Sequence, residues 1–406
     1  MKTAFLMHGI GWGGAAGSLL LLLQSLKNVK VEKHLITTID RDNLARKEFI
    51  KYSDSFKVID LPQLRNQASD GRTSLKQFNK IINGDYSALI DYLKELEIDI
   101  LHINSTVFSY LLESLKNELN IKIITHIRET LPAYDNGIIR NYIIEKIEKY
   151  SDKIICISDN EAAYFKDSNK IVILPNPFDF DYKYDIKQFY REKNHIESGT
   201  LLVAMSGQFS RSKGHLFFLK VINEILSYNE VKNKIKFIVF GLNEYTPLWK
   251  VIMKKILGRK DLSYEYKTFI HKHKLESYVD SLPFLYTNEF FNILNEVDIY
   301  VRPSLAGDPW GRDVIEAMAF GKPIVATGSS KFFIEDGVNG FLVEPQDCTS
   351  LAEKILDLVQ NENLRKEIGR RNKEKIKEMC DLEKYGIEIE KILNELLKTV
   401  AITKCK

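Results

Sequence analysis

The chain has 406 residues, of which 44% are hydrophobic, and its 58 basic and 55 acidic side chains give a formal net charge of +3. This near balance argues against a dedicated nucleic-acid binder, because such proteins gain affinity by neutralising many phosphates. One hydrophobic core rarely grows beyond about 250 to 300 residues, so the length predicts two domains.

Cysteine usage and apolar runs bear on the compartment. Four cysteines are scattered without C-x-x-C spacing: Cys156, Cys348, Cys380 and Cys405. This spacing indicates neither a zinc site nor a disulfide framework, and a reducing cytoplasm is expected. Glycines interrupt the N-terminal apolar stretch that a secretory signal requires, and no later run approaches the roughly 20 apolar residues of a membrane span. We therefore expect a soluble, unprocessed chain.

Short apolar runs alternate with segments of helical period along nearly the whole chain. This pattern is typical of parallel sheets whose strands are joined by crossover helices. The expected strands of a first sheet are residues 3–8, 33–38, 57–61, 98–103, 121–126, 153–158 and 170–174. A second set follows at residues 201–206, 235–240, 278–282, 297–303, 323–327 and 340–343. The fold class is therefore α/β, with two Rossmann-like parallel-sheet domains.

The set of strands restarts after a segment with two prolines, Pro175 and Pro177, which limit backbone freedom and favour a defined hinge. The predicted parts are a first domain over 1–180, a linker over 181–199, a second domain over 200–381 and a closing amphipathic helix over 382–406.

The first expected strand ends in a glycine-rich turn before a leucine-rich helix. The turn reads Gly9-Ile-Gly-Trp-Gly13-Gly14-Ala-Ala-Gly17. Glycines there permit positive φ and let backbone N–H groups approach a phosphate or a sugar closely. A dinucleotide fingerprint is a local rival, because Asp40 and Asp42 follow the second strand where that motif has an acidic residue.

A second turn opens the second domain and reads Ser206-Gly-Gln208-Phe-Ser-Arg211-Ser-Lys213-Gly214-His. A third candidate stretch runs from Asp308-Pro-Trp310-Gly311-Arg312 through Glu316 into Ala-Met-Ala and a short buried strand. Asp308 precedes a helix and Glu316 lies in its first turns, so both can face a ligand at the helix N-terminus, where unpaired N–H groups favour anions. Such a site suits a sugar hydroxyl and a diphosphate together.

The third stretch resembles the acidic loop-helix signature of retaining nucleotide-sugar glycosyltransferases of the two-Rossmann-domain (GT-B) type, glycosyltransferase family 4. That signature reads Glu, seven residues, Glu, whereas the first carboxylate here is Asp308, one methylene shorter. The second turn resembles the family's Gly-Arg-x-x-x-x-Lys-Gly clamp on the donor diphosphate. Lys213 matches, but Gln208 stands at the arginine position and offers only neutral hydrogen bonds, so Arg211 is the candidate to compensate.

The resemblance implies two Rossmann-like domains facing a cleft, with the closing helix crossing back onto the first domain. The alternative is an ordinary C-terminal helix packed on its own domain. By the same resemblance, Gly13 and Gly14 match a small-residue loop near the donor phosphates and the acceptor.

Another group of candidates ends two strands of the first domain. His126 is followed closely by Arg128 and Glu129, and open α/β sheets bind ligands at that edge. By resemblance, His126 matches the cleft histidine close to the transferred sugar, although a lone histidine is more often structural or exposed. His102 and Asn104, at an earlier strand end, form the second candidate pair.

The activity that the resemblance implies is transfer of a hexosyl group from a nucleoside-diphosphate sugar to a hydroxyl acceptor with retention of configuration. The Lys-, Ile- and Asn-rich composition is compatible with a bacterial surface glycan or lipid-linked glycan as acceptor. Alternatives are a non-catalytic nucleotide-sugar binding protein and a nucleotide-sugar epimerase of the same fold. We expect no cofactor and no metal, because Lys213 and the helix N-terminus after Gly311 can stabilise the departing diphosphate.

The expected roles divide into three sets. Residues expected to be catalytic are His126, Lys213, Asp308 and Glu316. Residues expected to bind the donor are Gly13, Gly14, Gln208, Arg211, Lys213, Asp308, Trp310, Gly311, Arg312 and Glu316. Residues expected on the acceptor side are Gly14, His102, Asn104, Arg128 and Glu129.

Residues 248–260 form a basic amphipathic segment that none of the motifs above includes. Its apolar residues Trp249, Ile252, Met253 and Ile256 recur at helical spacing among lysines. One interpretation is a surface helix packed on the sheet, with a solvated basic face. The other is a patch that touches anionic lipid or a lipid-linked acceptor. We therefore expect a cytoplasmic protein, with peripheral contact at the inner face of the membrane as the additional hypothesis.

Overall fold

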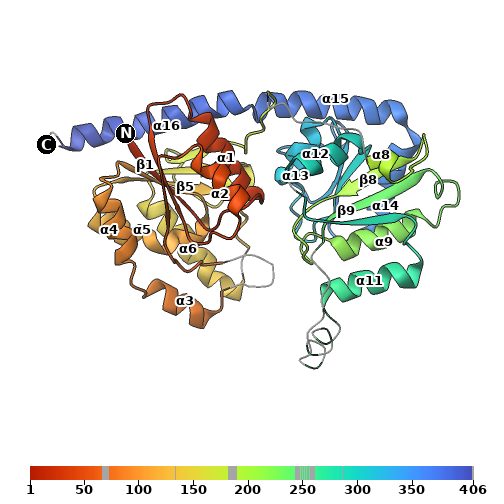
Figure 1. The fold of residues 1–406 in the computed structure, drawn as a ribbon, viewed down its shortest axis with the longest axis horizontal. Coiled ribbons are helices and arrows are strands. Elements are labelled where there is room, and N and C mark those ends of the chain that lie inside the picture. The colour runs from red at the N-terminus through yellow and green to blue at the C-terminus, as the bar shows by residue number, and fades with distance from the viewer. Residues whose placement is uncertain are drawn as a thin grey trace. The chain divides into compact units, whose positions relative to one another are not determined.

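The computed structural model describes residues 1–65, 73–132, 134–181, 190–242, 261–285 and 287–404, together with the single positions 247, 249, 251, 253 and 256. The chain divides into two compact units (Figure 1). Unit 1 comprises Met1–Asp179 and Cys380–Lys406, and unit 2 comprises Phe180–Met379. Each unit is a parallel sheet covered by helices, which confirms the predicted fold class.

Unit 1 is built on a seven-stranded parallel sheet in the order β3-β2-β1-β4-β5-β6-β7. Its strands are β1 (Lys2–Met7), β2 (Glu32–Thr37), β3 (Ser55–Val58), β4 (Ile100–Ile103), β5 (Lys122–Ile127), β6 (Lys153–Cys156) and β7 (Ile171–Ile173). All seven expected strands are present. The apolar runs of the inner strands are buried on both faces of the sheet, whereas the edge strands β3 and β7 are partly exposed. The strand order reverses between β1 and β4, the point where such sheets bind ligands.

The helices of unit 1 are α1 (Gly14–Ser25), α2 (Asn43–Ile50), α3 (Leu75–Ile82), α4 (Ser87–Glu95), α5 (Leu112–Glu118), α6 (Ile138–Tyr150), α7 (Asp159–Ala162) and α16 (Leu382–Lys404). Two short 3₁₀ helices, η1 (Thr106–Leu111) and η2 (Asp135–Gly137), are also described in this unit. The last helix, α16, lies beside α1 (Figure 1). Its Tyr385, Ile389 and Leu393 share a core with Leu19 and Leu22 of α1, so the chain returns to its first unit.

Unit 2 is built on a six-stranded parallel sheet in the order β10-β9-β8-β11-β12-β13. Its strands are β8 (Leu201–Met205), β9 (Ile235–Leu242), β10 (Val279–Pro283), β11 (Ile299–Arg302), β12 (Ile324–Thr327) and β13 (Phe341–Val343). The helices described in this unit are α8 (Tyr190–Lys193), α9 (His215–Ile225), α11 (Leu262–His273), α12 (Thr287–Glu296), α13 (Arg312–Ala319), α14 (Cys348–Gln360) and α15 (Glu362–Met379). Here the strand order reverses between β8 and β11, so the turns after these two strands are neighbours.

Part of the expected linker is bound to unit 2. The backbone N–H groups of Tyr190 and Arg191 each donate to Glu296 at 2.9 Å. The Arg191 guanidinium also pairs with Asp298 at 2.6 Å. Residues 182–189 lie outside the described part of the chain.

Most of the 248–260 segment, including its lysines, also lies outside the described residues. Of its described positions, Trp249, Met253 and Ile256 are exposed and Val251 is buried. No helix in the described part of the chain is long and apolar enough to cross a membrane. The peripheral membrane contact stays a prediction.

Candidate functional site

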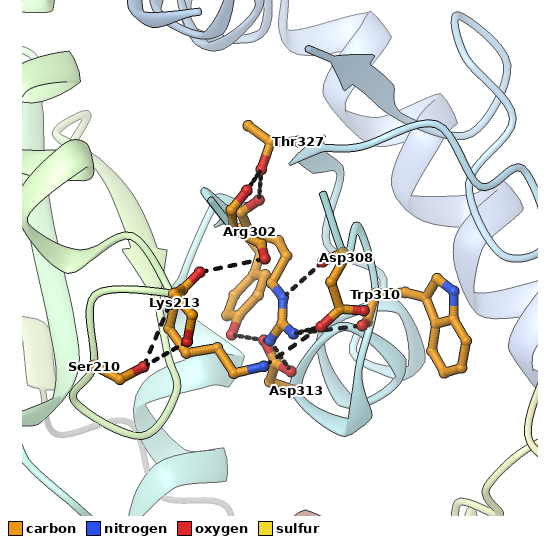
Figure 2. A network of polar contacts seen from close by, with 10 residues as sticks. Ser210, Lys213, Arg302, Asp308, Trp310, Asp313 and Thr327 are labelled. Carbon is orange, nitrogen blue, oxygen red and sulfur yellow. Dashed lines mark hydrogen bonds and ion pairs between the residues drawn. The ribbon is translucent and has the colours of Figure 1, made fainter. Parts of the chain in front are cut away.

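The last residue of strand β11 is a buried cation. Arg302 follows Ile299–Val301 in this strand, and it is only 3% exposed. Its Nη1 donates to both carboxylate oxygens of Asp313, at 2.7 and 2.9 Å, and its Nη2 donates to Asp308 Oδ2 at 3.0 Å (Figure 2). The Nε donates to the Asp308 carbonyl at 3.3 Å, and Nη2 donates to the Trp310 carbonyl at 3.4 Å. These bonds match the five N–H groups of a guanidinium.

This pairing keeps Arg302 charged. Burial by itself lowers the pKa of the guanidinium, but the Asp313 and Asp308 carboxylates hold that pKa above its ordinary value. Asp313 is held in turn by the Tyr300 hydroxyl, which donates to Oδ2 at 2.9 Å. A buried charge with several hydrogen-bonded partners fixes the loop that supplies them. The loop between β11 and α13 is therefore anchored from inside the unit.

Lys213 reaches the same carboxylate from the turn between β8 and α9. Its Nζ lies 3.5 Å from Asp308 Oδ2 (Figure 2). The two turns are tied together because the Leu305 N–H donates to the Ser212 carbonyl at 2.8 Å and the Ser304 hydroxyl donates to it at 3.4 Å. Two sequence motifs about 95 residues apart thus meet at the switch point of the sheet.

The neighbours of Lys213 set its charge state. The Arg302 guanidinium, followed by burial, lowers the pKa of the Lys213 ammonium, while the Asp308 and Asp313 carboxylates oppose that shift. The Lys213 side chain is 32% exposed, and its 3.5 Å contact is long for a charge-assisted hydrogen bond. A ligand anion that reaches the ammonium therefore competes with a weak contact.

Two helices begin at this site without a side-chain cap. Gly214 precedes α9 and Gly311 precedes α13, and neither helix start has a side-chain hydrogen bond. In the same unit, Asp261 caps α11 and Asp347 caps α14. The first N–H groups of an uncapped helix remain open to an anion, and the helix dipole favours one.

Glu316 and Arg312 form a second polar group on α13. Arg312 Nε donates to Glu316 Oε1 at 2.7 Å, and both side chains are largely buried. Burial raises the pKa of the Glu316 carboxyl, and the Arg312 guanidinium opposes this. Arg312 Nη1 is buried and has no hydrogen-bond partner among the described residues. Buried donors normally have partners, so this atom is suited to an oxygen atom of a ligand.

Three other residues expected at the donor site have different surroundings. The indole of Trp310 is 4% exposed, packs on Phe333 with ring centroids 4.8 Å apart, and points away from Lys213 (Figure 2). Arg211, the expected substitute for an arginine at position 208, pairs with Glu265 of α11 at 2.6 Å. Gln208 itself is exposed. Trp310 joins the network around Arg302 through its carbonyl oxygen and not through its indole (Figure 2).

The glycine-rich turn of unit 1 corrects one expectation. Gly9, Gly11, Gly13, Gly14 and Gly17 all lack positive φ, so the backbone does not need glycine for its conformation. A Cβ atom added at Gly11, Gly13 or Gly14 would meet nothing within 4 Å. The expectation of positive φ is wrong, but the open space leaves room for the close approach of a ligand.

The strand-end residues of unit 1 form one buried cluster. His126 is 0% exposed and His102 is 1% exposed, and their rings stack with centroids 5.4 Å apart. His126 Nδ1 lies 3.2 Å from Arg128 Nη2 and 3.3 Å from His102 Nε2. Burial, with the Arg128 charge, lowers the pKa of His102 to about 3 and that of His126 well below its ordinary value. Both rings are therefore neutral at pH 7.

The arginine contact also assigns the tautomer of His126. Because a guanidinium can only donate, Nδ1 accepts and the proton resides on Nε2, which is buried without a partner among the described residues. Asn104 accepts from Arg128 Nε at 2.7 Å and donates to the Ala15 carbonyl at 3.1 Å, which joins the cluster to the start of α1. Glu129 instead caps η1, accepting from the Thr106 N–H at 2.7 Å.

The sequence reading missed the two central residues of unit 2, Arg302 and Asp313. A signal for them was available. Arg302 ends a strand that is otherwise apolar, and a charged residue there requires a buried partner. Two aspartates follow within eleven residues, and these are its partners.

Comparison with known proteins agrees with the fold and the motifs. An uncharacterized glycosyltransferase of Methanocaldococcus jannaschii is 27% identical over 291 residues, which cover 70% of this chain and 71% of that one. The capsular polysaccharide biosynthesis glycosyltransferase CapM of Staphylococcus aureus is 23% identical over 277 residues, covering 63% of this chain and 65% of that one. The crystal structure of HepE from Anabaena in complex with UDP has a TM-score of 0.74 at 18% identity and covers 97% of this chain and 100% of that one.

The two parallel α/β units and the match to HepE define the GT-B class of fold. The family description "Glycosyltransferase Family 4" matches residues 12–182, and "Glycosyl transferases group 1" matches residues 186–375. The chain belongs to glycosyltransferase family 4, the group 1 glycosyl transferases, as its motifs predicted. It is therefore a glycosyltransferase.

Proposed function

We propose that the chain transfers a hexosyl group from a nucleoside-diphosphate sugar to a hydroxyl group of a glycan acceptor, with retention of the anomeric configuration. The observation that carries this proposal is the position of Lys213 beside Asp308, between two helix starts that have no side-chain cap. An ammonium and two sets of backbone N–H groups suit a diphosphate, and an adjacent carboxylate suits sugar hydroxyls. HepE, which shares the fold, has been crystallised with UDP and with UDP-glucose.

In this proposal the diphosphate is the leaving group. Cleavage of the bond between the sugar and the β-phosphate increases negative charge on that phosphate, and pre-placed donors stabilise it most effectively. Lys213 and the first N–H groups of α9 and α13 are the proposed donors. In this proposal these groups act without a metal ion, so we expect EDTA to leave the transfer rate unchanged. No carboxylate pair acts as the acid and nucleophile of a glycosidase.

The nucleoside and the sugar are assigned to different carboxylates. Glu316 accepts from the ribose hydroxyls, and the buried Arg312 Nη1 donates to a nucleotide oxygen. Among the described residues, the hydrogen bonds of the Asp308 carboxylate all use Oδ2, which leaves Oδ1 for a hydroxyl of the donor sugar. The donor roles proposed for Gly13 and Gly14 rest on the open space above them.

The acceptor side is assigned to unit 1. Neutral His126 is proposed to donate its Nε2–H to a sugar hydroxyl rather than to transfer a proton, because its lowered pKa makes it a weak base. Arg128, Asn104 and His102 orient that ring, and Gly14 leaves room above α1. The proposed acceptor class is a bacterial surface glycan or lipid-linked glycan. The similarity to CapM, a glycosyltransferase of capsular polysaccharide biosynthesis, supports it.

A panel of nucleotide sugars tests the proposal. A ligand that binds only the folded state raises the melting temperature, so the donor is identified first by thermal stabilisation. The donor is then incubated with glycan acceptors, and proton NMR of the product reads the anomeric configuration. Retention with acceptor-dependent release of nucleoside diphosphate supports the proposal.

Other outcomes separate the alternatives. Stabilisation without any sugar release indicates a binding protein, and release without an acceptor indicates an epimerase. No stabilisation by any nucleoside diphosphate or nucleotide sugar overturns the proposal.

A further inference from the structure

Arg302 offers no N–H group to a ligand. It is buried, and each of its donors is used within the unit. Its bonds fall on three points of the loop before α13 and its first turn: Asp308, Trp310 and Asp313. Whatever Arg302 contributes to the reaction must therefore act through this loop.

Asp308 is shared by two cations at unequal distances. Arg302 Nη2 lies 3.0 Å from Asp308 Oδ2, whereas Lys213 Nζ lies 3.5 Å from the same oxygen. The shorter contact belongs to the cation that cannot move, because Asp313 holds its other nitrogen at 2.7 Å and at 2.9 Å. Without this guanidinium, Asp308 would be free to pair fully with Lys213 and neutralise it.

The charges of the network balance before any ligand binds. Two cations, Arg302 and Lys213, face two carboxylates, Asp308 and Asp313. When a diphosphate takes Lys213, Asp308 still keeps its bond to Arg302, so the carboxylate is not left uncompensated. The ammonium can thus change partners at low cost.

We propose that Arg302 is a positioning residue for recognition of the donor sugar. It holds Asp308 Oδ2 so that Oδ1 faces the sugar, and it keeps Asp308 from sequestering Lys213. This inference rests on the proposed function, because it assigns Asp308 to the sugar and Lys213 to the diphosphate. The inference predicts that substitution of Arg302 weakens binding of the nucleotide sugar more than binding of the nucleoside diphosphate.

The test compares two dissociation constants in the full chain, for UDP and UDP-glucose, or for the matching pair that stabilises the wild type most. Arg302→Lys keeps the charge but cannot span Asp308 and Asp313 as a fork. We expect R302K to reduce the preference for the nucleotide sugar over the nucleoside diphosphate about tenfold, the scale of one lost charge-assisted hydrogen bond. Steady-state kinetics should show the same loss as a rise in the KM for the nucleotide sugar, with a smaller fall in kcat.

A double-mutant cycle separates positioning from general damage. In an Asp308→Asn background, R302K should cause no further loss of sugar preference, because the residue through which it acts is already changed. Arg191→Lys is the matched control, since Arg191 is a partly buried arginine of unit 2 paired with Asp298. That control should leave the preference unchanged.

Each outcome of these measurements either supports or overturns the inference about Arg302. An unchanged preference in R302K, or an equal loss in the D308N background, overturns the inference while wild-type binding keeps the proposed function. If R302K fails to fold, D308N alone must still lose sugar preference while it retains the nucleoside diphosphate, and equal weakening of both ligands overturns the inference. If the wild type binds neither ligand of any pair, the proposed function fails first and the inference falls with it.

Discussion

A Cβ atom on Gly214 would lie 1.8 Å from the carbonyl oxygen of Pro303. The turn that carries Lys213 can therefore meet the end of β11 only with glycine at this position. The φ of +81° at Gly214 imposes the same requirement on the backbone. In the Lys213-Gly214 pair of the motif, the glycine thus permits the close contact with Pro303 that positions the lysine.

Replacement of Gly214 by alanine should displace this turn. We expect a loss of about 1–3 kcal/mol in the free energy of unfolding from backbone strain, with additional cost from the clash. Nucleoside-diphosphate affinity should fall as Lys213 moves. Chemical denaturation and calorimetric titration measure the two effects, and native stability in G214A would contradict the geometry.

Gly14 provides the opposite case. An added Cβ meets nothing within 4 Å, and alanine favours helix by up to about 1 kcal/mol, so G14A should be at least as stable as the wild type. Its transfer rate should nevertheless fall, because the methyl group occupies the space proposed for a ligand. Stability and kcat/KM measured on the same preparation check both parts, and an unchanged kcat/KM would remove Gly14 from the site.

Lys213→Ala should reduce turnover by a factor on the order of one hundred or more, the usual effect of removing one donor from a developing negative charge. Lys220→Ala is a matched control, because Lys220 is an exposed lysine on the adjoining helix α9. Initial rates with saturating donor measure the difference. Near-native turnover in K213A would end the leaving-group assignment.

The buried histidines of unit 1 make stability depend on pH. The pKa of His102 is about 3 in the folded chain, below the ordinary value of 6.5, so between these values the unfolded chain binds the extra proton. Stability therefore rises with pH in this window and is lost on acidification, by about 1.4 kcal/mol per pH unit for one proton. Urea unfolding at pH 7, 6 and 5 measures the slope.

His102→Gln should make that slope shallower by about one proton. His271→Gln is the control, because the His271 side chain is 91% exposed. Equal slopes in H102Q and the wild type would show that His102 titrates normally in the folded chain.

The lipid-contact hypothesis can be tested through its lysines. Reversal of Lys250, Lys254 and Lys255 to glutamate should abolish co-sedimentation with anionic vesicles, because each basic residue near such a surface contributes about 1 kcal/mol. Reversal of Lys366, Lys373 and Lys377 on α15 makes the same charge change elsewhere. Identical sedimentation of the two variants would leave only the surface-helix interpretation.

Much of the fold was readable from the chain because a strand buried on both faces must be continuously apolar. All thirteen expected strands are present in the two sheets. The motifs around Lys213 and Glu316 were equally visible, since glycines before a helix and acids within it have a local physical purpose. The contacts of Arg211 and Trp310 could not be predicted from the sequence, because their partners, Glu265 and Phe333, come from other segments of the chain.

The sequence by itself determined the class of fold, the family, and which turns carry charge at strand ends, because these depend on local spacing of residue types. Only the tertiary structure decided that Arg302 pairs with Asp308, that Arg211 pairs with Glu265, and that His102 and His126 are buried together. The reason is physical. Which charges neutralise one another depends on separations of a few ångströms across neighbouring strands, and a linear pattern does not contain those distances.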